Sequence, residues 1–354
     1  KGTATASMLV SGGQQLDLMV QPPESIGSLL QHFTGSKAHN VHLRELALKK
    51  GLSLSEYGIK KNSKLETYDT EEKFYRALGM DWIPPEIREN TGEIELALTH
   101  SLPRLIELSD MKGDLHIHSS YPIEPSHDMG RNSMETMLKK AKKLNYEYLS
   151  FSEHNPSTGN HTSDAIYRIL TKRKEKIEQF KKSTKGIRII NSLETDILAN
   201  GRLAIDDKSL STLDYTVVSI HSSFGMNESS MTKRVLSGLS HPKAKILAHP
   251  TGRLLNKRAG YTLRWKEVFA FCKEHNKALE INSWPLRLDL PDVLVREAIA
   301  AGVHLVINTD SHEVLQMDLM RYGVAVARRG WTTPEHIVNS WSWTKFAQWF
   351  NIEA

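Results

Sequence analysis

Residues 113–119 read Gly-Asp-Leu-His-Ile-His-Ser, a short apolar run that ends in two histidines. Side chains alternate between the faces of a β-strand, so His116 and His118 are expected on the same face. Six later apolar runs predict further strands, at residues 146–151, 187–191, 215–220, 245–248, 278–281 and 303–307. Amphipathic helical patterns separate these runs, which predicts a parallel α/β arrangement, either open or closed.

Each predicted strand ends in residues that bind metal ions. After the first histidine pair, the chain offers His154, Glu194, His221, His249, Glu280, Asp310 and His312. Successive strand ends lie about one strand–helix unit apart, so parallel strands would gather these residues at the carboxyl end of the sheet, where α/β barrels place their active sites. Imidazole and carboxylate together suit zinc, manganese or iron(II). About nine candidates exceed the needs of one tetrahedral ion and predict two or three divalent metal ions.

Composition and charge limit the classes of function. The chain has 354 residues, of which 39% are hydrophobic and 25% are charged, as in ordinary globular proteins. Cys272 is the single cysteine, so no internal disulfide is possible, and no apolar run is long enough to span a membrane. Residues 1–110 hold 12 basic and 15 acidic side chains, whereas the remainder holds 34 and 26. The basic larger part fits a polyanionic substrate.

The strand-end motifs carry a family resemblance. Gly113 to Ser119, together with Ser152-Glu153-His154, Ala248-His249-Pro250 and Thr309-Asp310-Ser311-His312, resembles the PHP (polymerase and histidinol phosphatase) superfamily. The resemblance implies a distorted seven-stranded β/α barrel over residues 111–354, with a multinuclear metal centre that hydrolyses phosphoesters. The metal ligands it implies are His116, His118, His154, Glu194, His221, His249, Asp310 and His312.

The ninth ligand is the point at which this sequence departs from the family pattern. The family has an aspartate, or a histidine, shortly after the first motif. Spacing back from Ser133 puts Met129 at that position, with Asp128 and His127 immediately before it. We favour Asp128 as the ligand, with His127 or no ninth ligand as the alternatives.

The resemblance also implies a mechanism in which a metal-activated water attacks the phosphoester. His116, His118 and Asp310 would be catalytic as ligands of the activating ions, and Arg253, with Arg258 as a second candidate, would hold a phosphate oxygen. Glu280 and Asn282 would orient ligands from behind, and Glu153 and Asp196 would do likewise or cap helices.

A second resemblance covers the first 110 residues. Residues 33–40, Phe-Thr-Gly-Ser-Lys-Ala-His-Asn, resemble the thumb of family X DNA polymerases, and residues 15–18, Gln-Leu-Asp-Leu, resemble the last strand of the palm. This divides the chain into a palm-strand remnant at 1–22, a small α+β thumb-like domain at 23–110 and the PHP domain at 111–354. Nucleotide-facing positions carried over from the family are Asp17, Phe33, Gly35 and Asn40, although Gly35 can equally serve only to permit a tight turn.

The combined resemblance is to bacterial family X polymerases, in which a PHP domain follows the thumb. Two-metal polymerisation needs a paired Asp-x-Asp as well as the third carboxylate, and no such pair precedes Asp17, so polymerase activity is not expected. We interpret the chain as the C-terminal piece of such an enzyme. The resemblance implies a metal-dependent hydrolase that acts on DNA 3′ ends as a 3′–5′ exonuclease in DNA repair.

Two alternatives stay open. One is a small-molecule phosphatase of the histidinol-phosphatase type, and the other is a binding module without metal. We expect DNA as the partner, no membrane and no protein partner, and a cytoplasmic, nucleoid-associated location.

Overall fold

The computed structural model describes residues 5–352, and these form two compact units that meet between Arg104 and Leu105. The sequence predicted a boundary near Asp110, and the finer division at residue 22 stays a prediction. Among the described residues, no helix combines the length and the apolar character needed to cross a bilayer.

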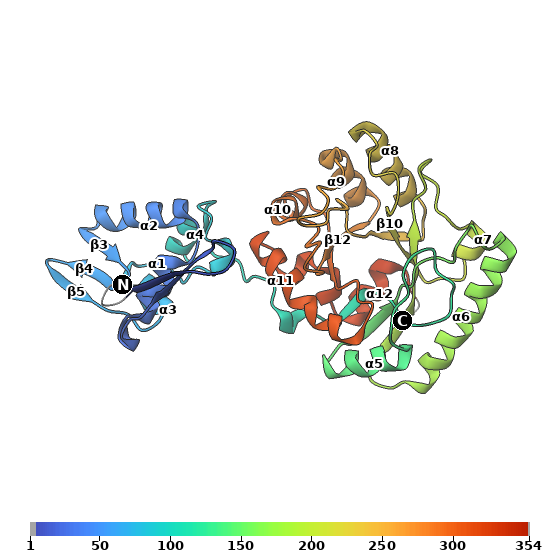
Figure 1. Ribbon diagram of the computed structural model, residues 1–354, viewed down its shortest axis with the longest axis horizontal. Coiled ribbons are helices and arrows are strands. Elements are labelled where there is room, and N and C mark those ends of the chain that lie inside the picture. Colours follow the sequence, from blue (N-terminus) through green and yellow to red (C-terminus); the bar gives the residue numbers. More distant parts are fainter. Residues whose placement is uncertain (1–4, 353–354) are drawn as a thin grey trace. The chain divides into compact units, whose positions relative to one another are not determined.

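The first unit is a small α+β domain (Figure 1). An antiparallel hairpin opens it, and a three-stranded antiparallel sheet follows two helices. Its strands and α-helices are β1 (Thr5–Leu9), β2 (Gln15–Met19), α1 (Ile26–Phe33), α2 (Lys37–Lys49), β3 (Leu52–Ser55), β4 (Gly58–Lys61), β5 (Lys64–Glu66), α3 (Glu71–Ala77) and α4 (Glu93–Leu98). Ser36 starts α2 by accepting a hydrogen bond from the His39 backbone N–H, as expected of an N-cap serine.

The second unit is built on eight short strands. They are β6 (Gly113–Ile117), β7 (Tyr148–Phe151), β8 (Arg188–Asn191), β9 (Glu194–Asp196), β10 (Thr216–Ser219), β11 (Ala244–Leu247), β12 (Ala278–Asn282) and β13 (Leu305–Asn308). Two parallel sheets, in the orders β6-β7-β8 and β13-β12-β11-β10-β9, contain them. A parallel bridge from Ile117 to Ser311 joins β6 to the segment after β13, and a second from His154 to Glu194 joins the segment after β7 to β9, which closes the ring. The seven predicted strand positions are thus occupied, with β8 and β9 following each other closely where one strand was predicted; the count of seven barrel strands stays a prediction.

Most of the helices surround this ring (Figure 1), whereas the last helix packs against the opposite face of the strands. The helices are α5 (Met134–Lys143), α6 (Ser163–Ser183), α7 (Asp207–Leu210), α8 (Glu228–Leu239), α9 (Trp265–Glu274), α10 (Asp292–Ala300), α11 (Met320–Arg329) and α12 (Trp343–Phe350). Ser133 caps α5 as predicted, by accepting a hydrogen bond from the Thr136 N–H.

The strands are buried on both faces, which explains their continuous apolar sequences. Along β13, Leu305 and Ile307 belong to one apolar cluster, whereas Val306 belongs to a second. The second cluster includes Phe346 and Phe350 of α12. Because both faces of the strands are packed, their positions are rigidly determined, and so are the residues that follow each strand.

Candidate metal centre

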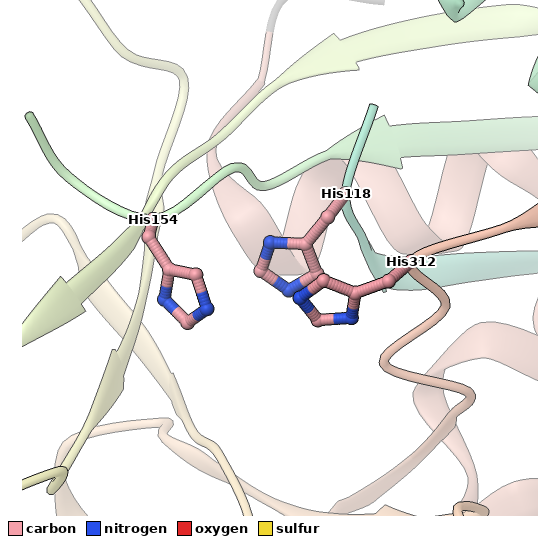
Figure 2. Close-up of side chains that lie close together, drawn as sticks. All are labelled: His118, His154 and His312. Atoms are coloured by element: carbon pink, nitrogen blue, oxygen red, sulfur yellow. The ribbon is translucent and has the colours of Figure 1, made fainter. Parts of the chain in front are cut away.

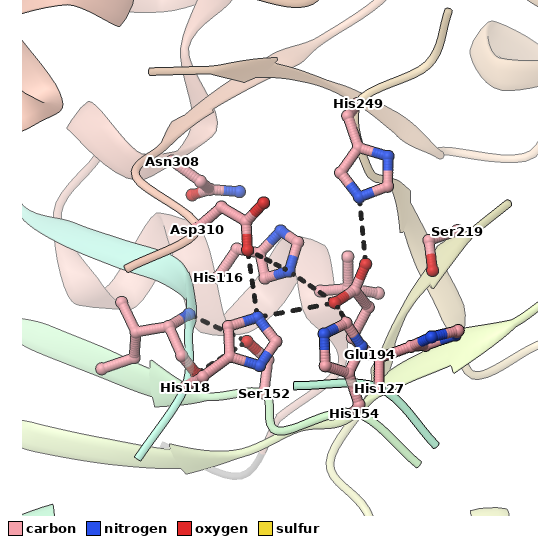
Figure 3. A network of polar contacts seen from close by, with 12 residues as sticks. His116, His118, His127, Ser152, His154, Glu194, Ser219, His249, Asn308 and Asp310 are labelled. Atoms are coloured by element: carbon pink, nitrogen blue, oxygen red, sulfur yellow. Dashed lines mark hydrogen bonds and ion pairs between the residues drawn. The ribbon is translucent and has the colours of Figure 1, made fainter. Parts of the chain in front are cut away.

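The carboxyl ends of the strands bring the predicted metal ligands together around one carboxylate, that of Glu194 (Figure 3). This side chain at the start of β9 is buried, and its oxygens lie 3.0–3.5 Å from ring nitrogens of five histidines: His116, His118, His154, His221 and His249. Asp310 lies on the other side of the first pair, with Oδ1 3.1 Å from His118 Nε2 and 3.5 Å from His116 Nε2. Residues separated by up to about two hundred positions in the chain therefore share one site.

Within residues 5–352, many of these buried atoms have no hydrogen-bond partner. They are His116 Nε2, His118 Nδ1, His154 Nδ1, Glu194 Oε2, His249 Nδ1 and His312 Nε2. Burying so many polar atoms without partners is costly, so the cluster calls for a ligand. Two ligands at 2.0–2.2 Å from one tetrahedral ion lie about 3.3–3.6 Å apart, close to the spacings observed here. The donor set therefore fits divalent cations.

The ligand atoms form overlapping groups, each within 4.8 Å. One group contains His116, His118, Glu194 and Asp310; a second contains His118, His154 and His312 (Figure 2); a third contains His154, Glu194 and His221. Glu194 belongs to two of these groups, as a carboxylate that bridges two ions would.

Asp128 and His127 lie in different surroundings. Asp128 Oδ1 is 3.4 Å from His154 Nε2, and Oδ2 is 3.3 Å from His312 Nε2, so Asp128 adjoins the second group. His127 Nε2 instead contacts Asp196 at 3.1 Å, and Asp196 also accepts a hydrogen bond of 2.7 Å from His221 Nδ1. His127, Asp196 and His221 form a fourth group of possible ligands, so the ninth ligand stays a prediction, and Asp196 also lies where it can orient His221.

The electrostatics of the centre are strongly coupled. Desolvation opposes the charge on His116, but the carboxylates of Glu194, Glu280 and Asp310 outweigh it and raise the pKa of His116 well above its usual value. Desolvation together with two neighbouring imidazoles lowers the pKa of His118 well below its usual value. The pKa of His154 rises to about 10, because Glu194 and Asp128 outweigh its desolvation. The carboxylates thus carry a negative charge that protons or cations must balance.

A second layer of side chains holds the ligands from behind. Glu280 accepts hydrogen bonds from His116 Nδ1 at 2.8 Å and from the His249 backbone N–H at 2.7 Å. Asn282 Nδ2 donates to Glu280 and to Asp310 Oδ2, both at 3.2 Å. These are the contacts expected of residues that fix ligand orientation, and that role of Glu280 and Asn282 stays a prediction. Sequence reasoning missed Asn308, which donates to Glu280 at 2.9 Å; its place at the end of β13 was the available signal.

Two ligands sit in strained backbone conformations. His249 has a φ of 29° and Asp310 has a φ of 53°, both in the left-handed region that non-glycine residues seldom adopt. Such strain persists only where surrounding structure imposes it, and it is common at functional sites.

A cavity of about 570 Å³ opens onto the ligands. Its walls include the metal-ligand candidates Asp128, His154, His221, Asp310 and His312, and three arginines, Arg131, Arg258 and Arg287. Arg253, which the sequence proposed as the phosphate-binding residue, is not among the lining residues. Its guanidinium donates instead to the backbone carbonyls of Arg287, at 2.8 Å, and Leu288. The prediction for Arg253 is thereby corrected: its donors hold the loop that carries Arg287.

The four nucleotide-facing positions that the family resemblance implies in the first unit lie outside the cluster around Glu194. Asp17 lies on β2, where Gln15 Nε2 donates to it at 2.8 Å, and Phe33 at the end of α1 is 61% exposed. Gly35 has a φ of 97° between α1 and α2, so the tight turn alone explains a glycine there. Asn40 accepts a hydrogen bond of 2.8 Å from Gln31 Nε2.

Comparisons with known proteins agree with this architecture. The family model described as DNA polymerase beta thumb matches residues 29–89, and the PHP domain model matches residues 114–284. The chain is 36% identical over 327 residues to the DNA polymerase/3′-5′ exonuclease PolX of Bacillus subtilis (strain 168), covering 92% of this chain and 56% of that protein. It is 24% identical over 155 residues to a probable phosphatase of Caldicellulosiruptor saccharolyticus, covering 43% and 59%.

The chain therefore spans little more than half the length of these relatives. Among solved structures, PsfC from Pseudomonas syringae PB-5123 matches with a TM-score of 0.35 and 17% identity, over 58% of this chain and 77% of that one. That similarity is too weak to support an argument.

Proposed function

This chain carries a DNA polymerase beta thumb and a PHP domain, and from this pair we propose that it is a metal-dependent phosphoesterase that hydrolyses phosphoesters at DNA 3′ ends. The PHP unit would act as a 3′–5′ exonuclease or 3′-end-processing enzyme. A thumb in the same chain as the hydrolytic unit and a relative named DNA polymerase/3′-5′ exonuclease both support DNA as the substrate. We place the activity in the cytoplasm at the nucleoid, because DNA is its proposed substrate.

The observation that carries the proposal is the set of buried nitrogen and oxygen atoms that lack hydrogen-bond partners and surround Glu194. We assign two or three ions, manganese, zinc or iron(II), to these residues: His116, His118, Asp128, His154, Glu194, His221, His249, Asp310 and His312. Bound divalent ions would supply Lewis acidity and lower the pKa of water to about 7.

The protein's own residues would prepare the site for that chemistry. Glu280 keeps the His116 Nδ1 proton in place, so that Nε2 faces the ligand cluster. Asn282 fixes the second oxygen of Asp310. Arg258 and Arg287 line the cavity, where guanidinium groups suit the non-bridging oxygens of a phosphoester.

The test uses the whole chain reloaded with Mn²⁺, Zn²⁺ or Fe²⁺ after chelation, with a labelled duplex that has a recessed 3′ end. Stepwise shortening from the 3′ end is expected with at least one metal and not with the chelated protein. Asp310→Ala should abolish shortening and keep the melting curve of a folded protein, whereas the exposed His275→Ala should behave like the parent. Shortening by Asp310→Ala at the parent rate would contradict the assigned site.

A second candidate function is that of a small-molecule phosphatase. The similarity to a protein named probable phosphatase favours this candidate, because that name carries no polymerase activity and the match covers 59% of that protein. Turnover of histidinol phosphate at a higher kcat/KM than the DNA 3′ end would select this alternative.

A further inference from the structure

One wall of the metal-site cavity is aromatic and basic, and none of its residues is needed to hold a cation. Phe224, from the loop after β10, and Trp284, from the loop after β12, line this wall together with Leu254, Arg258 and Arg287. The cavity volume of about 570 Å³ lies within the range of pockets that enclose one small organic molecule. A wall of this composition is complementary to a flat, partly apolar group next to the phosphoester of a substrate.

Phe224 and Arg258 form a built stacking unit. The guanidinium carbon of Arg258 lies 3.8 Å from the centroid of the Phe224 ring, and Arg258 Nε donates to the Gly252 carbonyl at 2.9 Å. Phe224 also lies nearly parallel to Tyr261, with 24° between the ring planes. A Cβ atom at Gly252 would lie 2.6 Å from the Tyr261 ring, so this packing depends on glycine at residue 252.

The loops that carry Arg258 and Trp284 are tied to each other. The Leu255 N–H donates to the Leu286 carbonyl at 2.6 Å, and Arg253 donates to the Arg287 carbonyl at 2.8 Å. The Trp284 N–H donates to Asn282 Oδ1 at 3.0 Å, and this asparagine also contacts Asp310. The backbone of Trp284 is therefore fixed relative to Asp310, and the loop that carries Trp284 is bonded to the loop that carries Arg258.

Arg287 is the residue of this wall that contacts a candidate metal ligand. Its Nε is 3.6 Å from Asp310 Oδ2, and Asp310 belongs to the buried ligand group. A phosphate positioned at the ligands would thus meet a guanidinium on the side that faces the aromatic wall.

We propose that Phe224, Arg258 and Trp284 form a subsite that stacks the terminal base of a nucleotide substrate while Arg287 faces its phosphate. This assignment rests on the proposed function and deepens it, because it makes the flat base the feature that is recognised. Aromatic rings and guanidinium planes are the surfaces on which nucleic-acid bases stack, with little dependence on sequence. A phosphoester that lacks a flat ring would make no stacking contact with Phe224, Arg258 or Trp284.

The test compares two single-stranded oligonucleotides that differ only at the 3′-terminal residue, which is a normal nucleotide in one and an abasic tetrahydrofuran nucleotide in the other. The quantity measured is kcat/KM for removal of that residue by the Mn²⁺-loaded full chain. Base stacking contributes about 5- to 150-fold in binding, so the parent protein should prefer the base-bearing end by about tenfold or more.

Phe224→Ala and Trp284→Ala should each reduce this preference to below about threefold, mainly through a higher KM for the base-bearing end. Phe224→Tyr and Trp284→Phe, which keep a ring, should retain it, as should Tyr322→Ala, an exposed aromatic position away from the cavity. The two alanine variants remove different rings, so the test does not depend on either one folding.

The inference is overturned if the preference persists in both alanine variants, or if the parent removes both termini equally well. Either result leaves 3′-end hydrolysis intact. Failure of the proposed function itself looks different, since the parent would then process neither oligonucleotide with any of the three metals.

Discussion

Replacing Glu280 by glutamine tests whether the residues behind the ligands govern metal affinity. Glu280 is fully buried and accepts four hydrogen bonds, from His116 Nδ1, the His249 N–H, Asn308 Nδ2 and Asn282 Nδ2, at 2.7–3.2 Å. His116 and Asn308 share one carboxylate oxygen, and the other two donors share the second. A glutamine has a single acceptor oxygen, so its amide N–H₂ would face two of the four donors whichever way it turns.

Each lost bond to a charged acceptor costs about 1.5–3 kcal/mol, and one of the two affected pairs orients a metal ligand directly. Loss of such a partner typically lowers metal affinity by about 10- to 100-fold, or about 1.4–2.7 kcal/mol. The pKa of Glu280 points the same way: desolvation raises it, but the nearby His116 outweighs desolvation and keeps the carboxyl ionised. The neutral amide cannot balance that imidazole.

The assay is a calorimetric titration of Mn²⁺ into chelated protein, for the parent, Glu280→Gln and Glu274→Gln. Glu274 is exposed at the end of α9, so its variant removes the same charge without touching the site. Near-ultraviolet circular dichroism verifies that each variant is folded. Affinity of Glu280→Gln within twofold of the parent would refute the reasoning.

Three further predictions concern single side chains. His116→Ala should lower DNA hydrolysis by at least a thousandfold in a gel assay while leaving a cooperative melt; equal rates for variant and parent would count against its role as a ligand. Arg173→Met should lower the free energy of unfolding by about 3–5 kcal/mol in urea, because it leaves the buried Glu153 without its partner. Lys174→Met, on the exposed face of the same helix, should change it by less than about 0.5 kcal/mol, and similar values for the two variants would contradict this. Burial raises the pKa of Asp289 to about 6, so the native state holds a proton that the unfolded state releases above about pH 4. The stabilisation by this proton is therefore present at pH 4 and is lost as the pH rises to 6. The loss in free energy of unfolding amounts to about 3 kcal/mol. Urea titrations at pH 4, 5 and 6 should show this loss in the parent and not in Asp289→Asn.

The strand positions and the ligand types were readable from the sequence because they depend on local order. A short apolar run between two amphipathic helical patterns is typical of a strand in a covered parallel sheet, and the residue that follows such a strand lies at the carboxyl edge. Each strand from β6 to β13 overlaps a predicted run, except β9, which was not predicted as a separate strand. The ligand cluster around Glu194 follows from that regularity, although the assignment of each ligand to an ion stays a proposal.

Side chains on loops could not be placed in this way. Arg253 and Arg258 lie five residues apart in one loop, yet the first bonds to backbone carbonyls and the second stacks on Phe224. Which arginine faces the cavity is decided by hydrogen bonds between loops that follow different strands, and no local pattern encodes those bonds.

The sequence by itself determined which residues reach the rim of the barrel, since strand periodicity and helix length act within one strand–helix unit. Only the tertiary structure decided how they share the rim: Glu194 lies at the centre, Asp128 adjoins both His154 and His312, and Arg287 lies beside Asp310. The physical reason is that these choices depend on distances between atoms of different units, which exist only after the ring has closed.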